Sequence, residues 1–321
     1  MSVRPHIAAL GGGTGLSSLL RGLKRAPVDL TAIVTVADDG GSSGRLRREL
    51  GVLPPGDIRN CLVALADDES LMGRLFQHRF ADGDLSGHPF GNLFLAALAE
   101  VTGSFDLAVQ ECSRVLKIRG SVLPSTLQHV RLWAEREDGQ HVCGETNIAS
   151  GVGSCRRVWL DPPPVAHGPA VEAIATADLI VLGPGSLFTS VLPHLAVPEI
   201  AEAVATAPGL RVYVCNVMTQ MGETDGFSAA DHAERILEAS PGGLDVVVAH
   251  EGPLDPAAVE AYGALGQVPV APDRARVEAL GARLVTADLA ETGSVVRHSP
   301  QALATVLLEL AMGAARAVPP R

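Results

Sequence analysis

Aromatic residues and positive charge are both scarce in this sequence. Phe, Trp and Tyr make up 3% of the 321 residues, too few for the stacked-ring platforms that bind single-stranded nucleic acids. Lys and Arg number 25 against 36 Asp and Glu, which gives a net charge of -11. Because nucleic-acid binding depends on cations that neutralise phosphates, this composition argues against a nucleic-acid partner. It still allows a small anion held by a few local arginines.

Paired cysteines and long apolar runs are also missing. The five cysteines, Cys61, Cys112, Cys143, Cys155 and Cys215, include no C-x-x-C pair and are odd in number, which argues against a zinc site or a disulfide framework. No stretch reaches the roughly 18 apolar residues of a membrane span, and the apolar run near the amino terminus is too short for a signal peptide. We therefore expect a cytoplasmic protein that does not span a membrane.

Signatures of several enzyme classes are absent as well. The sequence shows no catalytic triad pattern, no histidine pair at metal-ligand spacing and no candidate activated cysteine. Its composition, with 47% hydrophobic and 19% charged residues, is typical of a globular protein. We expect one elaborated domain over residues 1–321.

Five short apolar runs predict buried strands, because each ends in a polar or glycine-rich loop and gives way to a helical pattern. They are residues 6–10, 31–36, 178–182, 211–216 and 245–249. Strands that alternate with helices form a mostly parallel sheet, and the ligand of such a sheet binds beyond the carboxyl ends of the strands. We therefore expect an α/β fold whose five loops converge on one crevice.

Two stretches elaborate this pattern. Residues 52–118 show apolar spacings of three and four, which predicts helices. Residues 121–161 predict a β-hairpin that turns at Asp138-Gly139, followed by another strand. An amphipathic helix, capped by Ser299, is predicted from there to residue 318.

Two glycine-rich loops can present backbone amides to an anion. The first, GGGTG at 11–15, lacks the Lys-Ser/Thr pair of a P-loop, and Leu16 stands where a dinucleotide fingerprint has its last glycine. The second, GPGS at 183–186, is the stronger signal because Ser186 and Thr189 fall on successive turns of one helix face. A tight structural turn is the alternative for either loop.

Two adjacent acids, Asp38 and Asp39, end the second predicted strand. A carboxylate at this position can bond a ribose or hold Mg²⁺ beside a diphosphate. The alternative is a helix cap formed by the serines that follow, with the acids only near a helix start. The arginines behind them form a solvated helix face or return toward the acids.

Further polar residues stand at helix starts and strand ends. They are Arg59 and Asn60 in GDIRN, His88 and Asn92 in HPFGN, and Asn216, Thr219, Gln220, Glu223 and Thr224 in CNVMTQMGETDG. Helix caps and satisfied loops compete with ligand contacts as explanations of these motifs, and Asp57 is a candidate cap. Tyr262 can stack on a base, and Arg297, at the end of the predicted strand SVVRH, can pair with a diphosphate.

Taken in order, these motifs resemble those of the YvcK-type gluconeogenesis factors, in the superfamily of the 2-phospho-L-lactate transferase CofD. The motifs are GGGTG, TVADDGGSSGRLR, PPGDIRN, HPFGN, GPGSLFTSVLP, YVCNVMTQMGETDGFSAADH and VVRHSP, from about residue 6 to about residue 312. The resemblance implies a Rossmann-like sheet with helices on both faces and an inserted helical and β-hairpin region. It also implies a nucleotide-diphosphate crevice and a homodimer.

The resemblance also implies site residues. It places phosphate loops at Gly12, Gly13, Thr14 and Gly15 and at Gly183, Gly185 and Ser186, an acidic pair at Asp38 and Asp39, polar contacts at Asn60 and Asn92, and nucleotide-sugar contacts at Tyr262 and Arg297. Asn216 and Thr219 join this set from their place after a buried strand.

Two functions follow from the resemblance. The YvcK branch implies a regulator that binds a UDP-sugar such as UDP-N-acetylglucosamine, needs no cofactor, and supports cell shape and envelope growth on gluconeogenic carbon sources through an unknown protein partner. The transferase branch implies Mg²⁺-dependent transfer of a phospholactyl group from a guanosine-diphosphate-linked donor to a deazaflavin. An NAD-dependent dehydrogenase is disfavoured because the glycine fingerprint is incomplete.

Overall fold

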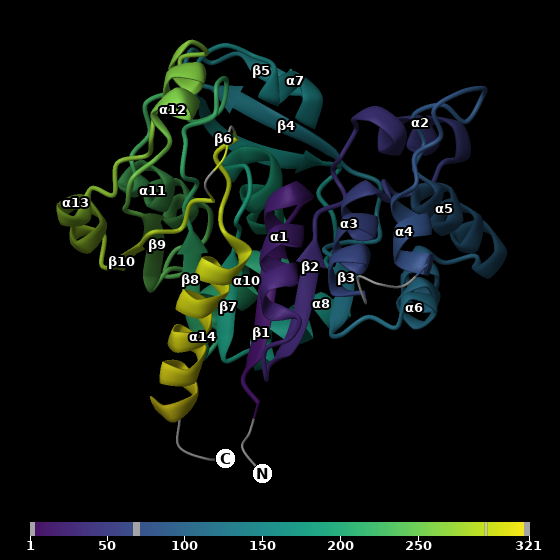
Figure 1. The fold of residues 1–321 in the computed structure, drawn as a ribbon, viewed down its shortest axis with the longest axis horizontal. Coiled ribbons are helices and arrows are strands. Elements are labelled where there is room, and N and C mark those ends of the chain that lie inside the picture. Colours follow the sequence, from purple (N-terminus) through teal and green to yellow (C-terminus); the bar gives the residue numbers. More distant parts are fainter. Residues whose placement is uncertain (1–3, 67–70, 292, 294, 318–321) are drawn as a thin grey trace.

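Seven parallel strands form the central sheet of the protein (Figure 1). The structure is a computed structural model that describes residues 4–66, 71–291, 293 and 295–317. The strand order is β10-β9-β8-β7-β1-β2-β3, and each neighbouring pair runs parallel. The strands are β1 (His6–Gly11), β2 (Asp29–Val34), β3 (Ser121–Pro124), β7 (Leu179–Leu182), β8 (Leu210–Val214), β9 (Val246–His250) and β10 (Arg283–Ala287).

The inner strands are continuous apolar runs because helices cover both faces of the sheet. In β1, Ile7 and Ala9 point into one core and Ala8 and Leu10 into the other, and all four are fully buried. The helices on the first face are α1 (Gly13–Leu23), α3 (Gly56–Leu65), α4 (Leu71–Gln77), α5 (Phe90–Thr102), α6 (Phe105–Leu116) and α14 (Pro300–Ala317). The helices on the second face are α8 (Gly168–Thr176), α9 (Leu192–Leu195), α10 (Pro198–Thr206), α11 (Ala229–Ala239) and α13 (Arg274–Ala279).

The chain leaves β1 in two directions. It first adds β2 and β3 on one side, and later adds β7, β8, β9 and β10 on the other side of β1. The loops after β1 and β7 therefore lead away from each other, at the reversal of strand order where open α/β sheets bind their ligands. The strand order of the sheet thus predicts a binding site between these two loops.

A smaller antiparallel sheet lies beyond the carboxyl ends of the parallel strands (Figure 1). Its order is β5-β4-β6, made of β4 (Arg131–Arg136), β5 (His141–Cys143) and β6 (Cys155–Asp161). The hairpin of β4 and β5 turns where the Asp138-Gly139 pair predicts it. Three more helical elements, α2 (Gly41–Leu50), α7 (Glu145–Ala149) and α12 (Pro256–Gly263), border the same end of the molecule, and the π-helical turn η1 (Leu187–Val191) precedes α9.

The predicted α/β fold with a mostly parallel sheet and helices on both faces is confirmed. All five predicted strands are present, and the C-terminal helix begins at Pro300 with the Ser299 hydroxyl accepting the Ala302 amide (3.3 Å). The predicted strand SVVRH is wrong for the residues described, where only an isolated bridge between Ala290 and His298 occurs. Residues 292, 294 and 318 lie outside the described residues.

Within the described part of the chain, no single helix is both long and apolar enough to cross a membrane. One bent pair of helical segments, Leu187–Leu195 and Pro198–Thr206, meets the length and composition test with an angle of 82° between its halves. Both segments contribute buried side chains to the core on the second face of the sheet, among them Leu192 and Ile200.

Candidate functional site

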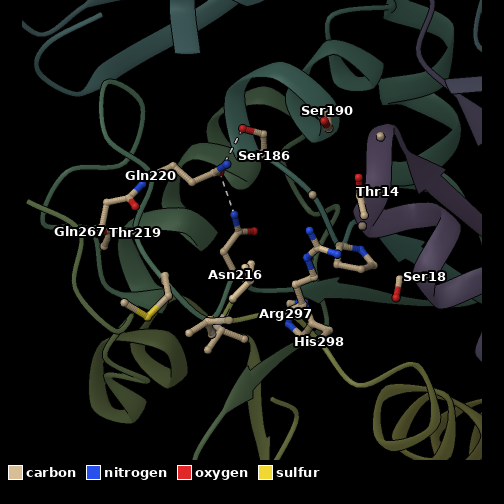
Figure 2. Close-up of a pocket in the computed structure, with 18 of the residues that line it drawn as sticks. Thr14, Ser18, Ser186, Ser190, Asn216, Thr219, Gln220, Gln267, Arg297 and His298 are labelled. Atoms are coloured by element: carbon tan, nitrogen blue, oxygen red, sulfur yellow. Dashed lines mark hydrogen bonds between the residues drawn. The ribbon is translucent and has the colours of Figure 1, made fainter. Parts of the chain in front are cut away.

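A cavity of about 510 Å³ lies at the reversal of strand order. Its walls come from residues 12–15 after β1, 184–186 after β7, 216–220 after β8, Tyr262 in α12, and residues 295–298. Figure 2 shows polar side chains from these separate segments facing a common space. The topology of the sheet brings them together, as the convergence of loops at the carboxyl ends of parallel strands requires.

The first loop is shaped by contacts that exclude a side chain. A Cβ at Gly12 would lie 2.7 Å from Oδ2 of Asp57, and a Cβ at Gly15 would lie 2.5 Å from the Pro184 carbonyl oxygen. Helix α1 begins at Gly13, whose amide donates to Asp57, and its N-cap residue Gly12 has no side chain to cap the amides that follow. The N-terminus of α1 therefore faces the cavity as a group of donors with a positive partial charge.

The second loop is held by a chain of polar contacts. Oγ of Ser186 lies 2.7 Å from both carboxyl oxygens of Glu223 and 3.0 Å from Oε1 of Gln220, which also accepts from Nδ2 of Asn216 at 2.8 Å (Figure 2). Burial raises the pKa of Glu223 to about 7. Gly185, at φ +154°, takes a backbone conformation that favours glycine.

Arg297 supplies the cation of the cavity. Figure 2 shows its side chain reaching into the space between Asn216 and Thr14. It is exposed and makes no ion pair with any described carboxylate, so its guanidinium is available for a bidentate anion. Tyr262, half-buried on the wall, anchors the neighbouring loop through its carbonyl, which accepts from the amides of Leu265 and Gln267.

Carboxyl groups gather behind the first loop. Asp57 accepts the Gly13 amide, and burial together with the charge of Asp38 raises its pKa to about 6. Glu145, which α7 brings over from the smaller sheet, has a pKa raised to about 9 by burial and by the charges of Asp38 and Asp57. Burial also raises the pKa of Asp38, although the Gly40 amide donates to its Oδ1 at 2.8 Å. The cluster is therefore short of positive charge.

The acidic cluster offers few ligands for Mg²⁺ on its own. No group of three His, Cys, Asp or Glu among the described residues is arranged to hold a metal ion. Mg²⁺ usually keeps several waters and binds one or two carboxylates together with phosphates of a ligand. Asp38 and Asp57, which repel each other beside a phosphate-type loop, fit that donor set. Asp39 has another role, because its Oδ1 accepts from both the amide and the hydroxyl of Thr146 at 3.1 Å and so holds α7.

This cavity is lined by most of the site residues that the sequence predicts. They are Gly12, Gly13, Thr14, Gly15, Gly185, Ser186, Asn216, Thr219, Tyr262 and Arg297. The other selected residues, which do not line it, are Gly183, Asp38, Asp39, Asn60 and Asn92. Gly183 lies just behind the second loop at φ +87°, and the ligand roles of the whole set stay predictions.

Asn60 and Asn92 do not line the cavity, and other side chains engage them, including Asp57 for Asn60. Oδ1 of Asn60 accepts from Nη2 of Arg59 at 2.6 Å, and the buried Asn92 donates to Oγ of Ser42 at 3.0 Å. Of the arginines after the acidic pair, Arg47 lies close enough for its charge to act on Asp38 and Asp39, although its guanidinium bonds elsewhere. Arg45 donates to the Ser86 carbonyl at 2.6 Å, and Arg47 donates to the Val130 carbonyl.

Sequence reasoning missed three residues of this region. Asp57 was a candidate cap, but it lies in the first turn of α3, after the N-cap Pro55, and faces the first loop. No sequence pattern indicates Glu145, because a hairpin motif does not show which part of the main sheet the hairpin will cover. His298 stands beside Arg297 in the VVRHSP motif, and that adjacency was the available signal.

Comparison with known proteins gives a consistent result. Residues 7–290 match the family model described as 2-phospho-L-lactate transferase CofD. The chain is 48% identical to the gluconeogenesis factor of Bacillus subtilis strain 168, over 97% of this chain and 99% of that protein. It is 47% identical to the gluconeogenesis factor of Halalkalibacterium halodurans, over 95% and 96%. A crystal structure of a UPF0052 family member from Bacillus halodurans superposes with a TM-score of 0.92 at 46% identity, covering 95% of this chain and 99% of that one.

Proposed function

Because the chain belongs to the CofD family, on the branch of proteins named gluconeogenesis factors, we propose that it is a cytoplasmic regulator that binds a UDP-sugar such as UDP-N-acetylglucosamine. One observation carries the proposal. A single cavity joins two anion-binding loops, an arginine without a carboxylate partner among the described residues, and a half-buried tyrosine. A nucleoside diphosphate needs donors for two phosphates and a surface for its base, and these groups supply both.

The proposed ligand is held by complementary charge and stacking. The amides at the start of α1 and after Gly185 receive the diphosphate, and the Arg297 guanidinium pairs with it. Tyr262 packs against the uracil ring. The half-buried acids beside the first loop oppose this anion unless they are protonated or neutralised, so Mg²⁺ at Asp38 and Asp57 strengthens binding.

Regulation rather than turnover is the proposed outcome of binding. The protein reports the supply of a nucleotide sugar to a partner in envelope synthesis, and thereby links carbon metabolism on gluconeogenic sources to cell shape. A homodimer is the proposed assembly. The names of the relatives, which refer to gluconeogenesis, support the metabolic half of this proposal.

Calorimetry with matched variants tests the ligand. Wild-type protein is titrated with UDP-N-acetylglucosamine beside Tyr262→Ala, Arg297→Ala and the control Arg119→Ala, an exposed arginine that lies outside the cavity. We expect each cavity variant to bind at least about tenfold more weakly, a loss of roughly 1.4 kcal/mol, while the control binds normally. Unchanged affinity in both cavity variants would contradict the proposed site.

The acidic cluster favours a second candidate, the transferase activity named by the family model. In that function Asp38 and Asp57 would hold Mg²⁺, which supplies stabilisation of charge that develops on phosphoryl oxygens. The two loops would position the guanosine-diphosphate-linked donor. Formation of the phospholactyl deazaflavin by wild-type protein, and its loss in Asp57→Asn, would replace the regulator proposal.

A further inference from the structure

His298 lines a cavity that presents many hydrogen-bond donors. The amides of both loops, the Arg297 guanidinium and the hydroxyls of Thr14 and Ser18 can all donate toward a bound anion. His298 lines the same cavity, directly beside Arg297 (Figure 2). What it offers to a ligand depends on which ring nitrogen carries its proton.

The structure fixes that proton. Nε2 of His298 lies 3.1 Å from the carbonyl oxygen of Cys215, and a carbonyl oxygen can only accept, so Nε2 is the donor. Burial, and then the nearby His250, lowers the pKa of His298 to about 4, which leaves the ring neutral at pH 7. The other nitrogen, Nδ1, therefore carries a lone pair.

This lone pair has no partner within the described residues. His298 is half-buried and lines the cavity, and its Nδ1 is not among the fully buried polar atoms that lack a hydrogen bond, so this atom keeps accessible surface. The neighbouring His250 is engaged elsewhere, because its Nδ1 accepts from the Leu289 amide at 3.1 Å. Nδ1 of His298 is an open acceptor.

An open acceptor selects against some ligand groups and for others. The oxygens of an ionised diphosphate cannot donate, so Nδ1 cannot serve the group that Arg297 and the loops hold. We infer that His298 is a specificity residue that accepts a hydrogen bond from a hydroxyl of the sugar next to the diphosphate. This inference rests on the proposed function. The hydroxyl belongs to the ribose or to the second sugar, which share this chemistry.

Two isosteric substitutions separate the two nitrogens of the ring. In His298→Gln the side-chain amide reaches the position of Nε2, so it keeps the bond to the Cys215 carbonyl and removes the acceptor at Nδ1. In His298→Asn the shorter side chain places its carbonyl oxygen near the position of Nδ1, so it keeps the acceptor and loses the structural bond. If His298 has only a structural role, His298→Asn should weaken ligand binding more than His298→Gln does. If His298 recognises the ligand, His298→Gln should weaken binding more.

The test is titration of each variant with UDP-N-acetylglucosamine, UDP and inorganic pyrophosphate, with thermal unfolding as the structural readout. We expect His298→Gln to bind UDP-N-acetylglucosamine roughly 5- to 50-fold more weakly with unchanged pyrophosphate affinity, and His298→Asn to stay within about threefold of wild type despite a lower Tm. A parallel loss for UDP places the donor in the uridine half of the ligand, and a loss for UDP-N-acetylglucosamine alone places it on the second sugar.

Two results would overturn the inference. One is wild-type affinity of His298→Gln for all three ligands. The other is an equal loss for pyrophosphate, which would mean that His298 acts only by positioning Arg297. If the wild-type protein binds pyrophosphate but neither uridine ligand, the proposed function fails together with this inference. If the wild-type protein binds UDP-N-acetylglucosamine and His298→Gln binds it equally well, only the role of His298 is refuted.

Discussion

Gly15 joins the two halves of the proposed site. A Cβ at this position would lie 2.5 Å from the Pro184 carbonyl oxygen, on the opposite loop. We predict that Gly15→Ala forces the loops apart, weakens UDP-sugar binding at least about tenfold and lowers the free energy of unfolding by about 1 to 3 kcal/mol. Titration calorimetry and urea unfolding measure both effects. The control is Gly168→Ala, where a Cβ meets nothing within 4 Å; equal behaviour of the two variants would contradict the prediction.

Single residues differ in how far the sequence predicts them. Glycines after buried strands indicate amide-lined loops, and the parallel sheet then dictates that the loops after β1 and β7 meet, as Gly15 and Pro184 do. The motif HPFGN predicts only a helix start. Whether Asn92 faces the cavity depends on how α5 packs, and packing turns it toward Ser42. Side-chain direction at a helix start is set by tertiary contacts, which a single motif does not contain.

At the scale of elements, α7 and the loop at Gly222 are tied by one buried arginine. Arg136 is 3% exposed and donates to the carbonyls of Gly153 and Gly222 at 2.7 Å each and of Ile148 at 3.0 Å. These bonds bring α7, which carries Glu145, over the acidic cluster. Removing the guanidinium would leave three carbonyls without their donor.

We predict that Arg136→Met lowers the free energy of unfolding by about 2 to 4 kcal/mol and speeds hydrogen exchange in residues 145–153 and 221–225. The matched control is Arg157→Met on β6, whose arginine is exposed and pairs with Glu135 at the surface. A surface pair contributes little, so this control should lose less than about 1 kcal/mol. The prediction fails if the two variants unfold alike.

The elements that the sequence predicts are those with the most uniform surroundings. β1, β2, β7, β8 and β9 lie inside the sheet, so nearly every residue is apolar and each strand ends visibly at a polar loop. The two edge strands, β3 and β10, were not predicted. β10 mixes exposed Arg283 with buried Leu284 and is paired on one side only, so its pattern resembles that of a loop.

For the whole molecule, the acids with raised pKa values predict how stability depends on pH. The pKa values of Asp57, Glu223 and Glu145 are raised to about 6, 7 and 9, mainly by burial. Burial lowers the pKa of His194, His232 and His298 to about 4, so these rings offset the acids below about pH 6. From about pH 6 to pH 9 the folded protein holds more protons than the unfolded chain, so the free energy of unfolding falls as pH rises through this window. Urea unfolding of the ligand-free protein at pH 6, 7.5 and 9 should show that decline.

Glu145→Gln should remove the upper part of the decline and raise the free energy of unfolding at pH 9 by about 1 to 3 kcal/mol. The exposed Glu100→Gln serves as the control and should leave the pH profile unchanged. A wild-type protein that gains stability from pH 6 to pH 9 would refute the protonated cluster.

The central claim is that one ligand is held between two loops that belong to opposite halves of the sheet. Hydrogen–deuterium exchange with and without saturating UDP-N-acetylglucosamine tests it most directly, because the proposed contacts are backbone amides. The account predicts slower exchange at residues 13–15 and 185–187 together, with little change at residues 99–105 on the distant side of α5. Protection of only one loop, or of neither, would contradict a site at the reversal of strand order.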